Sequence, residues 1–363
     1  MRTRLALTCA LLTTTVTATA PLPAPLSGTP AAPPAVVAPV EPAAVPAGEL
    51  PYEWVSSDAQ WVAHIDVRAA LASEMAQMID TTDWDDEEAT RELRDRLGLE
   101  IKRDIHAVTV YGQEDDEDSL VVLVQGDERL DEARQRLMGL LRHGRVEHDG
   151  QAVDRWVADD GDDPFYTYLA KHSDSSERVL VLAVNAPGVV RGLRTLQGRA
   201  PHLDAGARAA LAPSPGAFVT VVAHEGFSEL ADLDPTSRVA ELVQSVVLEV
   251  GEHDASLFAR LSVGARNEFD AQQIGSVLQG AASLFSLVAQ NEPEAEPLIP
   301  IMRNLQIRTE GNRVTVRIQH DSRELMSLLE GELGHRRQMS EVDEMRRRPE
   351  TVEAVAEEED GWY

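Results

Sequence analysis

Four residues near the ends of two predicted strands have the side chains of a metal site. His64 and Asp66 end the first predicted strand of one half of the chain, and His224 and Glu225 end the first predicted strand of the other. Imidazole and carboxylate groups bind zinc, and a zinc ion with an open position activates water for hydrolysis. If the two halves pair with pseudo-symmetry, these four residues converge. The alternative is that the histidines are half-buried strand residues and that Asp66 caps the next helix.

A second group of residues could hold a sugar or a cationic ligand. Trp156 precedes the segment "DDGDDPFYTYLA", in which Phe165, Tyr166 and Tyr168 follow four aspartates. Aromatic faces beside carboxylates are typical of sites for cations and carbohydrates. The alternative is a strand edge on which Tyr166 and Tyr168 alternate with one packed face.

The segment "YGQEDDEDSLVVLVQG" places five consecutive acids, Glu114 to Asp118, between two apolar runs. It lacks the glycine and the closing glutamate of a calcium-binding loop. A comparable segment, "VVLEVGEHDASLFARLSVG" at 246–264, has a connection two residues shorter. Two hairpins whose connections differ in length and acidity indicate solvated turns, so we interpret the acids as a turn rather than a cation site.

Motifs of the common hydrolases and nucleotide-binding proteins are missing from the sequence. There is no HExxH zinc motif, no GxSxG serine elbow and no glycine-rich phosphate loop. The pairs His148-Asp149, His253-Asp254 and His320-Asp321 fall at predicted turns or at a helix start, where aspartate bonds the local backbone. The sequence therefore predicts no catalytic residue and no cofactor.

The two ends of the chain differ in composition from the middle. Residues 1–18 have Arg2 and Arg4, then an apolar run and small residues, which is the pattern of a secretory signal peptide. Residues 19–50 are rich in proline and alanine and predict an extended tether. Residues 335–363 combine arginine clusters with an acidic end and predict a disordered tail. We expect an exported protein, periplasmic or extracellular.

The amino-acid composition limits the classes of partner that the protein could bind. The formal net charge is −29, which argues against nucleic acid, because phosphate binding requires a basic surface. The only cysteine, Cys9, lies in the predicted signal peptide, so disulfides and thiol chemistry are excluded from the mature chain. The remaining apolar runs are too short to span a bilayer. The expected partner is an unidentified envelope or extracellular protein or glycan.

Alternating apolar residues predict an α+β fold built from two related halves. Each half, 51–200 and 201–334, is expected to be a mostly antiparallel sheet with helices on one face. In "LQIRTEGNRVTVRIQH" the apolar residues point one way, while Arg308, Thr315 and Arg317 point to a solvated face. Both halves show the order strand, helix, hairpin, helix, hairpin, helix.

A long helix is predicted at 268–290, with a broad apolar stripe. The stripe comprises Phe269, Ile274, Val277, Leu278, Ala281, Leu284, Phe285 and Val288. A stripe of that width normally packs in the core, so we expect this helix to bury it.

The signal peptide, the tether, the opening strand "DAQWVAHIDV" and the late hairpin "GNRVTVRI" together resemble uncharacterised exported proteins of planctomycete-type bacteria. The resemblance covers about 55–331, rests on pattern, and implies no functional residues.

These patterns favour an exported, soluble, non-catalytic binding or assembly module of the cell envelope or exterior. A metal-assisted hydrolase at His64, Asp66, His224 and Glu225 is the first alternative. A carbohydrate-binding protein that uses Trp156 and its neighbouring aromatics is the second.

Overall fold

The computed structural model describes most of the chain between residues 50 and 327. The described residues are 50–78, 90–91, 93–113, 116–158, 163–171, 176–203, 213–224, 239, 241–289 and 298–327. They form one 12-stranded sheet in the order β11-β12-β10-β9-β8-β1-β2-β3-β7-β6-β5-β4, in which every pair of neighbours is antiparallel. The predicted α+β class and antiparallel pairing are confirmed.

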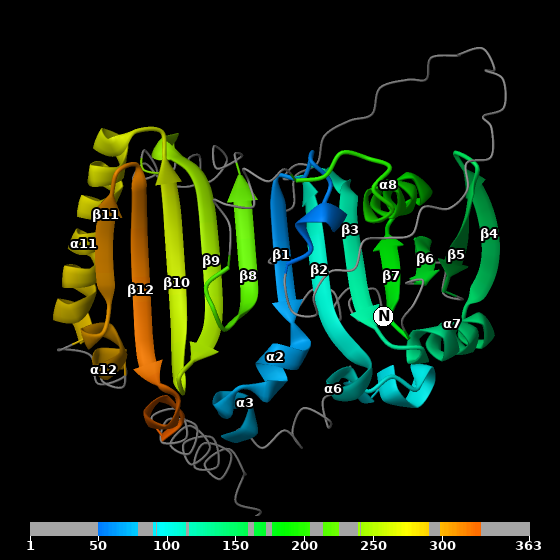
Figure 1. Ribbon diagram of the computed structural model, residues 1–363, viewed down its shortest axis with the longest axis horizontal. Coiled ribbons are helices and arrows are strands. Elements are labelled where there is room, and N and C mark those ends of the chain that lie inside the picture. The colour runs from blue at the N-terminus through cyan, green and yellow to red at the C-terminus, as the bar shows by residue number, and fades with distance from the viewer. Residues whose placement is uncertain are drawn as a thin grey trace, which may run out of the picture.

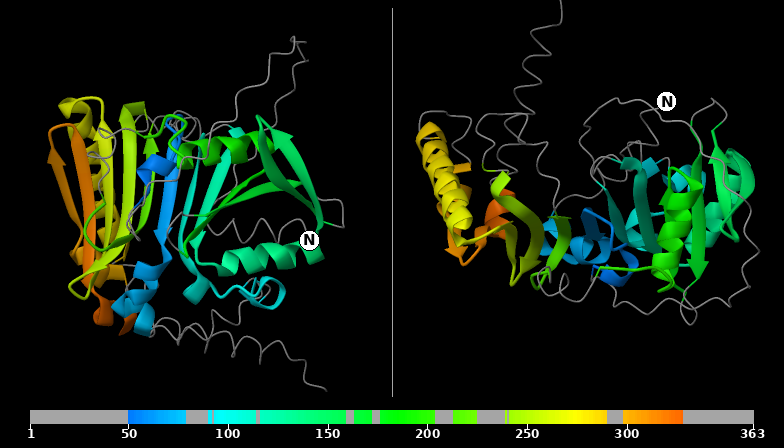
Figure 2. Two further views of the ribbon diagram at one scale, coloured as in Figure 1. Left: turned by 45° about the vertical axis from the view of Figure 1, so that its right-hand side comes forward. Right: turned by 90° about the horizontal axis from the view of Figure 1, so that it is seen from above.

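The strands form a single row across the molecule, with β1 and β8 in the middle (Figure 1). Their bounds are β1 Trp61–Asp66, β2 Ile105–Gln113, β3 Asp116–Gly126, β4 Arg142–His148, β5 Gln151–Val157, β6 Phe165–Lys171, β7 Arg178–Ala183, β8 Ala217–His224, β9 Val243–His253, β10 Ser256–Ala265, β11 Gln306–Glu310 and β12 Arg313–Asp321. Seen from above, the row is long and curved (Figure 2).

The helices connect these strands and flank the sheet. Their bounds are η1 Tyr52–Trp54, α2 Val67–Ala72, α3 Glu74–Met78, η2 Leu93–Leu97, α6 Ile101–Asp104, α7 Arg129–Leu140, α8 Ala186–Leu196, α11 Glu268–Ala289 and α12 Leu298–Arg303. A further helical turn follows β12 at 322–327.

Tight turns close three of the hairpins where the sequence predicts them. Asp149 and Gly150 have φ values of 49° and 75°, and Asp254 and Ala255 have values of 50° and 57°. Two consecutive positive φ values define a type I′ turn, whose twist matches that of the flanking strands. Gly311 between β11 and β12 also has a positive φ, of 56°.

Side-chain caps stabilise the starts of two helices, α2 and α8. The Asp66 carboxylate accepts a hydrogen bond from the backbone N–H of Ala69, at 2.9 Å. The Asn185 side-chain oxygen accepts from Gly188 N–H at the start of α8, at 2.7 Å. A side-chain cap of this kind stabilises a helix by about 1 kcal/mol. The interpretation of Asp66 as a cap is confirmed.

The acidic connection between β2 and β3 is only partly described. Glu114 and Asp115 lie outside the described residues. The Asp116 side chain accepts from Asp118 N–H at 3.0 Å, and the Ser119 hydroxyl donates to the Asp116 carbonyl at 2.6 Å. These bonds within the turn match the turn interpretation for that part of the acidic run.

Helices lie on both faces of the sheet, so the prediction of helices on one face is wrong. A Cβ added at Gly192 of α8 would meet Val121 of β3 and Val181 of β7 within about 3 Å. Leu130 of α7 packs in a different cluster, which contains Leu180 of β7. Leu180 is the residue immediately before Val181 in that strand. Because neighbouring strand residues point to opposite faces, α7 and α8 cover opposite sides. We call them the α7 face and the α8 face.

The main core lies beneath α8. It joins the segment before β1, the α8 face of the central strands and one side of α8, and includes Val55, Val121, Leu123, Val181, Val189 and Leu196. Gly188 and Gly192 let α8 approach the sheet closely, since a Cβ at either position would come within 3 Å of a strand side chain.

Helix α11 lies on the α7 face at the β11 end of the sheet (Figure 1). Ile274 is buried there against Val263 and Val314. Phe269 and Leu284, however, are 66% and 65% exposed. The prediction that the whole apolar stripe is core is therefore wrong, because α11 contacts the narrow β10–β12–β11 end with only one side.

Candidate functional site

A row of polar side chains crosses the α8 face through the strand register. The row comprises Thr109 on β2, His64 on β1, Thr220 on β8, Glu249 on β9, Arg260 on β10, Arg317 on β12 and Gln306 on β11, each opposite the next. Beyond Thr109 the same register continues into Leu123 and Val181. The face therefore changes from apolar beneath α8 to charged at the β11 end.

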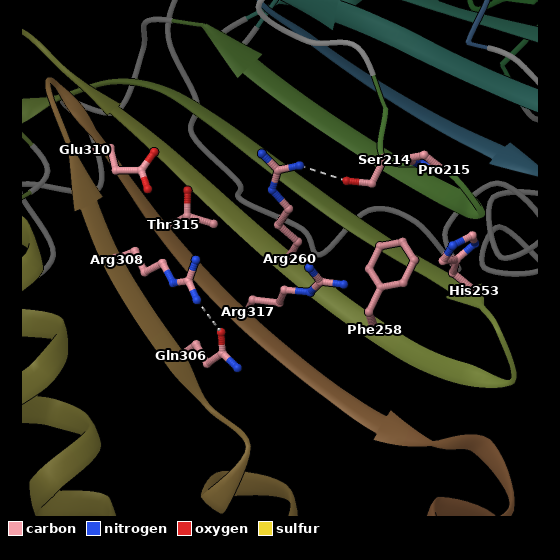
Figure 3. Close-up of a pocket in the computed structure, with 10 residues that line it drawn as sticks. All are labelled: Ser214, Pro215, His253, Phe258, Arg260, Gln306, Arg308, Glu310, Thr315 and Arg317. Carbon is pink, nitrogen blue, oxygen red and sulfur yellow. Dashed lines mark hydrogen bonds between the residues drawn. The ribbon is translucent and has the colours of Figure 1, made fainter.

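A hollow of about 440 Å³ opens on the charged end of this face (Figure 3). It is lined by Ser214, Pro215, His253, Phe258, Arg260, Gln306, Arg308, Glu310, Thr315 and Arg317. We call it the arginine hollow. Its size is within the range typical of small-molecule sites, about 300–1,000 Å³.

Three arginines line the hollow, Arg260, Arg308 and Arg317. Arg260 forms an ion pair with a buried acid, Glu249. Glu249 is 2% exposed and lies 3.5 Å from the Arg260 guanidinium. Its carboxylate also accepts from the backbone N–H and the hydroxyl of Ser214, at 2.5 and 2.9 Å. Arg260 donates to the same hydroxyl at 2.8 Å. Glu249 thereby forms an ion pair with Arg260 and attaches the segment before β8 to the rim of the hollow.

An aromatic ring supports the second arginine. The Arg317 guanidinium carbon lies 5.8 Å from the centre of the Phe258 ring, within cation–π range. The ring in turn covers Gly251 on β9, where an added Cβ would come within 2.7 Å of Phe258. Phe258 is 3% exposed, so it is a rigid support rather than an open platform for a ligand.

The third arginine, Arg308, donates to the Gln306 side-chain oxygen at 3.3 Å. Among the described residues, neither Arg308 nor Arg317 forms an ion pair with an acid. Arg317 lies directly opposite Arg260 in the strand register, and like charges at such positions repel one another. The hollow is thus a positively charged surface on a protein with a net charge of −29.

The predicted metal ligands are not brought together. β1 and β8 are antiparallel, with His64 opposite Thr220 and His224 beside Gln60. The two histidines are therefore about 13 Å apart along the strands, at about 3.3 Å per residue. Asp66 caps α2, and Glu225 lies outside the described residues. Within the described part of the chain, no group of three or more histidine, cysteine or acidic side chains could hold a metal ion.

His64 has a different environment from the one a zinc ligand requires. It is 3% exposed, and its Nδ1 is 2.9 Å from the Thr109 hydroxyl oxygen. Its Nε2 has no hydrogen-bond partner among the residues that the structure describes. Burial lowers the pKa of His64 from 6.5 to about 4, because the charged imidazolium loses its hydration.

The predicted aromatic group is divided between the two faces. Trp156 is fully buried on the α7 face, where its indole N–H donates to the Thr167 hydroxyl at 2.8 Å. Phe165 lies beside it, with ring centres 6.4 Å apart. Tyr166 and Tyr168 point to the other face and pack against the core beneath α8. These four side chains do not form one platform.

The sequence patterns did not indicate the arginine hollow as a site. They predicted that Arg308, Thr315 and Arg317 lie on one solvated face, which is confirmed. The missing information was the pairing of β12 with β10, which adds Arg260 to that face. A search for basic residues at alternate positions in separate hairpins would have found the candidates but not their adjacency.

Comparisons with known proteins identify no family. No family model matches the chain, and no curated protein matches it. The solved structures include three crystal forms of TP0453, forms I, III and IV. They show 12%, 13% and 13% identity with TM-scores of 0.39, 0.40 and 0.40, and each covers 77% of this chain and 96%, 97% and 96% of the other. At these TM-scores the likeness gives no guide to function.

Among the described helices, none has both the length and the hydropathy needed to cross a membrane. The chain contains a single cysteine and so forms no internal disulfide.

Proposed function

We propose that this protein is an exported, non-catalytic binding module of the cell envelope or exterior, and that the arginine hollow binds an anionic ligand. The observation that carries the proposal is the pair Arg308 and Arg317, two guanidinium groups without an acidic partner among the described residues, in one hollow. Arginine binds carboxylate, phosphate and sulfate groups in two-pronged geometry. The ligand is therefore a small anion or an acidic group of an envelope protein or glycan.

Charge supports an anionic ligand in two ways. The repulsion between Arg260 and Arg317 costs free energy in the unbound protein, and a bound anion removes that cost. The surrounding protein is strongly acidic, so the hollow differs from the rest of the surface. A ligand that depends on charge binds more weakly as salt screens the interaction.

The test is binding of anionic and neutral sugars by calorimetry. We expect glucose 6-phosphate and glucuronate to bind the wild-type protein and glucose not to bind. The double variant Arg308→Gln/Arg317→Gln should lose at least about tenfold in affinity, since hydrogen bonds to charged groups contribute about 1.5–3 kcal/mol each.

The matched control is Arg194→Gln/Arg303→Gln, which removes two positive charges outside the hollow. Its affinity should equal that of the wild-type protein. If both double variants lost affinity equally, the loss would be explained by net charge rather than by the hollow. If neither glucose 6-phosphate nor glucuronate bound the wild-type protein, the proposed function would be overturned.

Export is proposed from the N-terminal sequence, in which Arg2 and Arg4 precede an apolar run. Mass spectrometry of the protein from its native cells should find a mature chain that begins at about residue 19. Recovery of the intact N-terminus in the cytoplasmic fraction would contradict it. The resemblance to exported proteins of planctomycete-type bacteria is retained as a hypothesis on the same grounds.

We also propose that the chain consists of two related halves. In support, β1 and β8 lie side by side, each beside a hairpin, β2–β3 or β9–β10. Helices α7 and α11 follow those hairpins on the same face of the sheet. The halves differ in strand number, and α8 has no counterpart over β9–β12 among the described residues. This difference leaves the arginine hollow open.

A further inference from the structure

The charges around the arginine hollow indicate how much negative charge the ligand carries. Glu249 forms an ion pair with Arg260 at 3.5 Å. Glu310 also lines the hollow and lies opposite Arg313, which does not line it, in the β11–β12 register. Arg308 and Arg317 are the arginines of the hollow that form no ion pair among the described residues. Two such guanidinium groups match a group with two negative charges.

The positions of these side chains match a compact group. Arg260 and Arg317 are opposite one another on β10 and β12, and Arg308 and Thr315 are opposite one another on β11 and β12. In Figure 3 the Arg260 and Arg308 guanidinium groups, the Thr315 hydroxyl and the Glu310 carboxylate lie around the hollow, and the Arg317 guanidinium extends toward the Phe258 ring. Guanidinium N–H groups and a hydroxyl are donors to oxyanions.

We propose that the arginine hollow selects a doubly charged oxyanion, as in a phosphate monoester or a pair of neighbouring carboxylates, over singly charged anions. Arg308 and Arg317 contact the group directly. Arg260 is a positioning residue, because Glu249 and Ser214 already bind it. This inference rests on the proposed function and specifies the charge of the ligand.

The test compares ligands that differ in charge on one sugar ring. Glucose 6-phosphate, glucuronate and glucose carry two, one and no negative charges at pH 7.5. We expect glucose 6-phosphate to bind at least about tenfold more tightly than glucuronate, because each arginine then has its own charge to pair with. Malonate, with two carboxylates, distinguishes paired carboxylates from phosphate as the preferred source of the two charges.

Single variants separate the roles of the arginines. Arg308→Gln and Arg317→Gln should each bring the affinity for glucose 6-phosphate close to that for glucuronate. Thr315→Val, which keeps the side-chain shape, should weaken both ligands by a smaller factor. Thermal unfolding of each variant establishes that it is folded before binding is measured.

A pH series provides a second readout. A phosphate monoester gains its second charge near pH 6, so the affinity for glucose 6-phosphate should rise several-fold between pH 5 and 7.5. Inorganic sulfate is doubly charged throughout and reports any titration of the groups that face the hollow, which are His253, Glu249 and Glu310. The affinity for sulfate should change less than that for glucose 6-phosphate.

The outcomes distinguish the two proposals. Equal affinity for glucuronate and glucose 6-phosphate, lost together in Arg308→Gln/Arg317→Gln, would overturn the selection of two charges and leave the proposed function intact. Binding of glucose 6-phosphate that Arg308→Gln and Arg317→Gln leave unchanged would overturn both.

Discussion

The two ends of the α8 face differ in what covers them. At the β7 end, Leu123 and Val181 lie beneath α8 and are fully buried. At the β11 end, the same register places Arg260, Arg317 and Gln306 side by side on an open surface. One continuous sheet therefore serves as core at one end and as a candidate binding surface at the other. The two ends differ in their side chains and in the helix that covers only one of them.

The helices repeat this contrast. Leu193 of α8 is fully buried, whereas Leu284 of α11 is 65% exposed. Burial of a leucine contributes a few kcal/mol to folding. The covered end should thus supply most of the stability of the fold. Substitutions at the open end should have little effect on stability and should alter ligand binding instead.

The largest expected effect tests this division directly. Leu193→Ala should lower the free energy of unfolding by about 3 kcal/mol, because it leaves a cavity at a fully buried position. Leu284→Ala, the same change on α11, should lower it by less than about 0.5 kcal/mol. Urea unfolding followed by circular dichroism measures both. Comparable losses in the two variants would show that α11 is buried in solution and would break the comparison.

The next effect concerns the boundary between the two ends, where His64 is buried. Its folded pKa of about 4 lies below the unfolded value of 6.5, so the unfolded chain binds a proton first as the pH falls. The stability contribution is therefore intact above pH 6.5 and is lost progressively between pH 6.5 and 4. At pH 5 the loss should be about 2 kcal/mol relative to pH 7.5.

His64→Gln should remove that loss, since glutamine does not titrate and can still bond Thr109. The measurement is urea unfolding of wild type and variant at pH 7.5 and 5. His202, an exposed histidine, provides the control variant His202→Gln, which should retain the wild-type pH dependence. If wild type and His64→Gln lose stability in parallel, His64 is not the group responsible.

The smallest effect concerns the open end. Arg317→Gln removes a charge opposite Arg260 and should raise the free energy of unfolding by a few tenths of a kcal/mol at low salt. The gain should fall in 0.5 M salt, where exposed charges are screened. Arg303→Gln, outside the hollow, should show no such gain. A loss of stability in Arg317→Gln would mean that its contact with Phe258 outweighs the repulsion.

Much of the local structure could be predicted from the sequence. The hairpin expected in the segment 246–264 is β9–β10, and the one expected in "LQIRTEGNRVTVRIQH" is β11–β12. Type I′ turns fall at the predicted Asp149-Gly150 and in the "EHDA" connection. Such features depend on alternating polarity and on residues that adopt positive φ, both of which are local properties.

The candidate sites were predicted less well. His64 and His224 were expected to meet, but antiparallel pairing of β1 and β8 separates them along the strands. Trp156 was expected at a ligand site, but it fills the space beneath α7 and hydrogen-bonds Thr167. In each case the residue type suits a binding site. The direction of the strand, or the face to which the side chain points, prevents that site from forming.

The sequence by itself determined the strands, the turns, the caps and the acidic composition, because these depend on residues near one another in the chain. Only the tertiary structure decided which strands became neighbours and which face α8 covered. Arg260 and Arg317 are far apart in sequence and are opposite one another only through the pairing of β10 with β12. The arginine hollow therefore depends on long-range register, which no local pattern specifies.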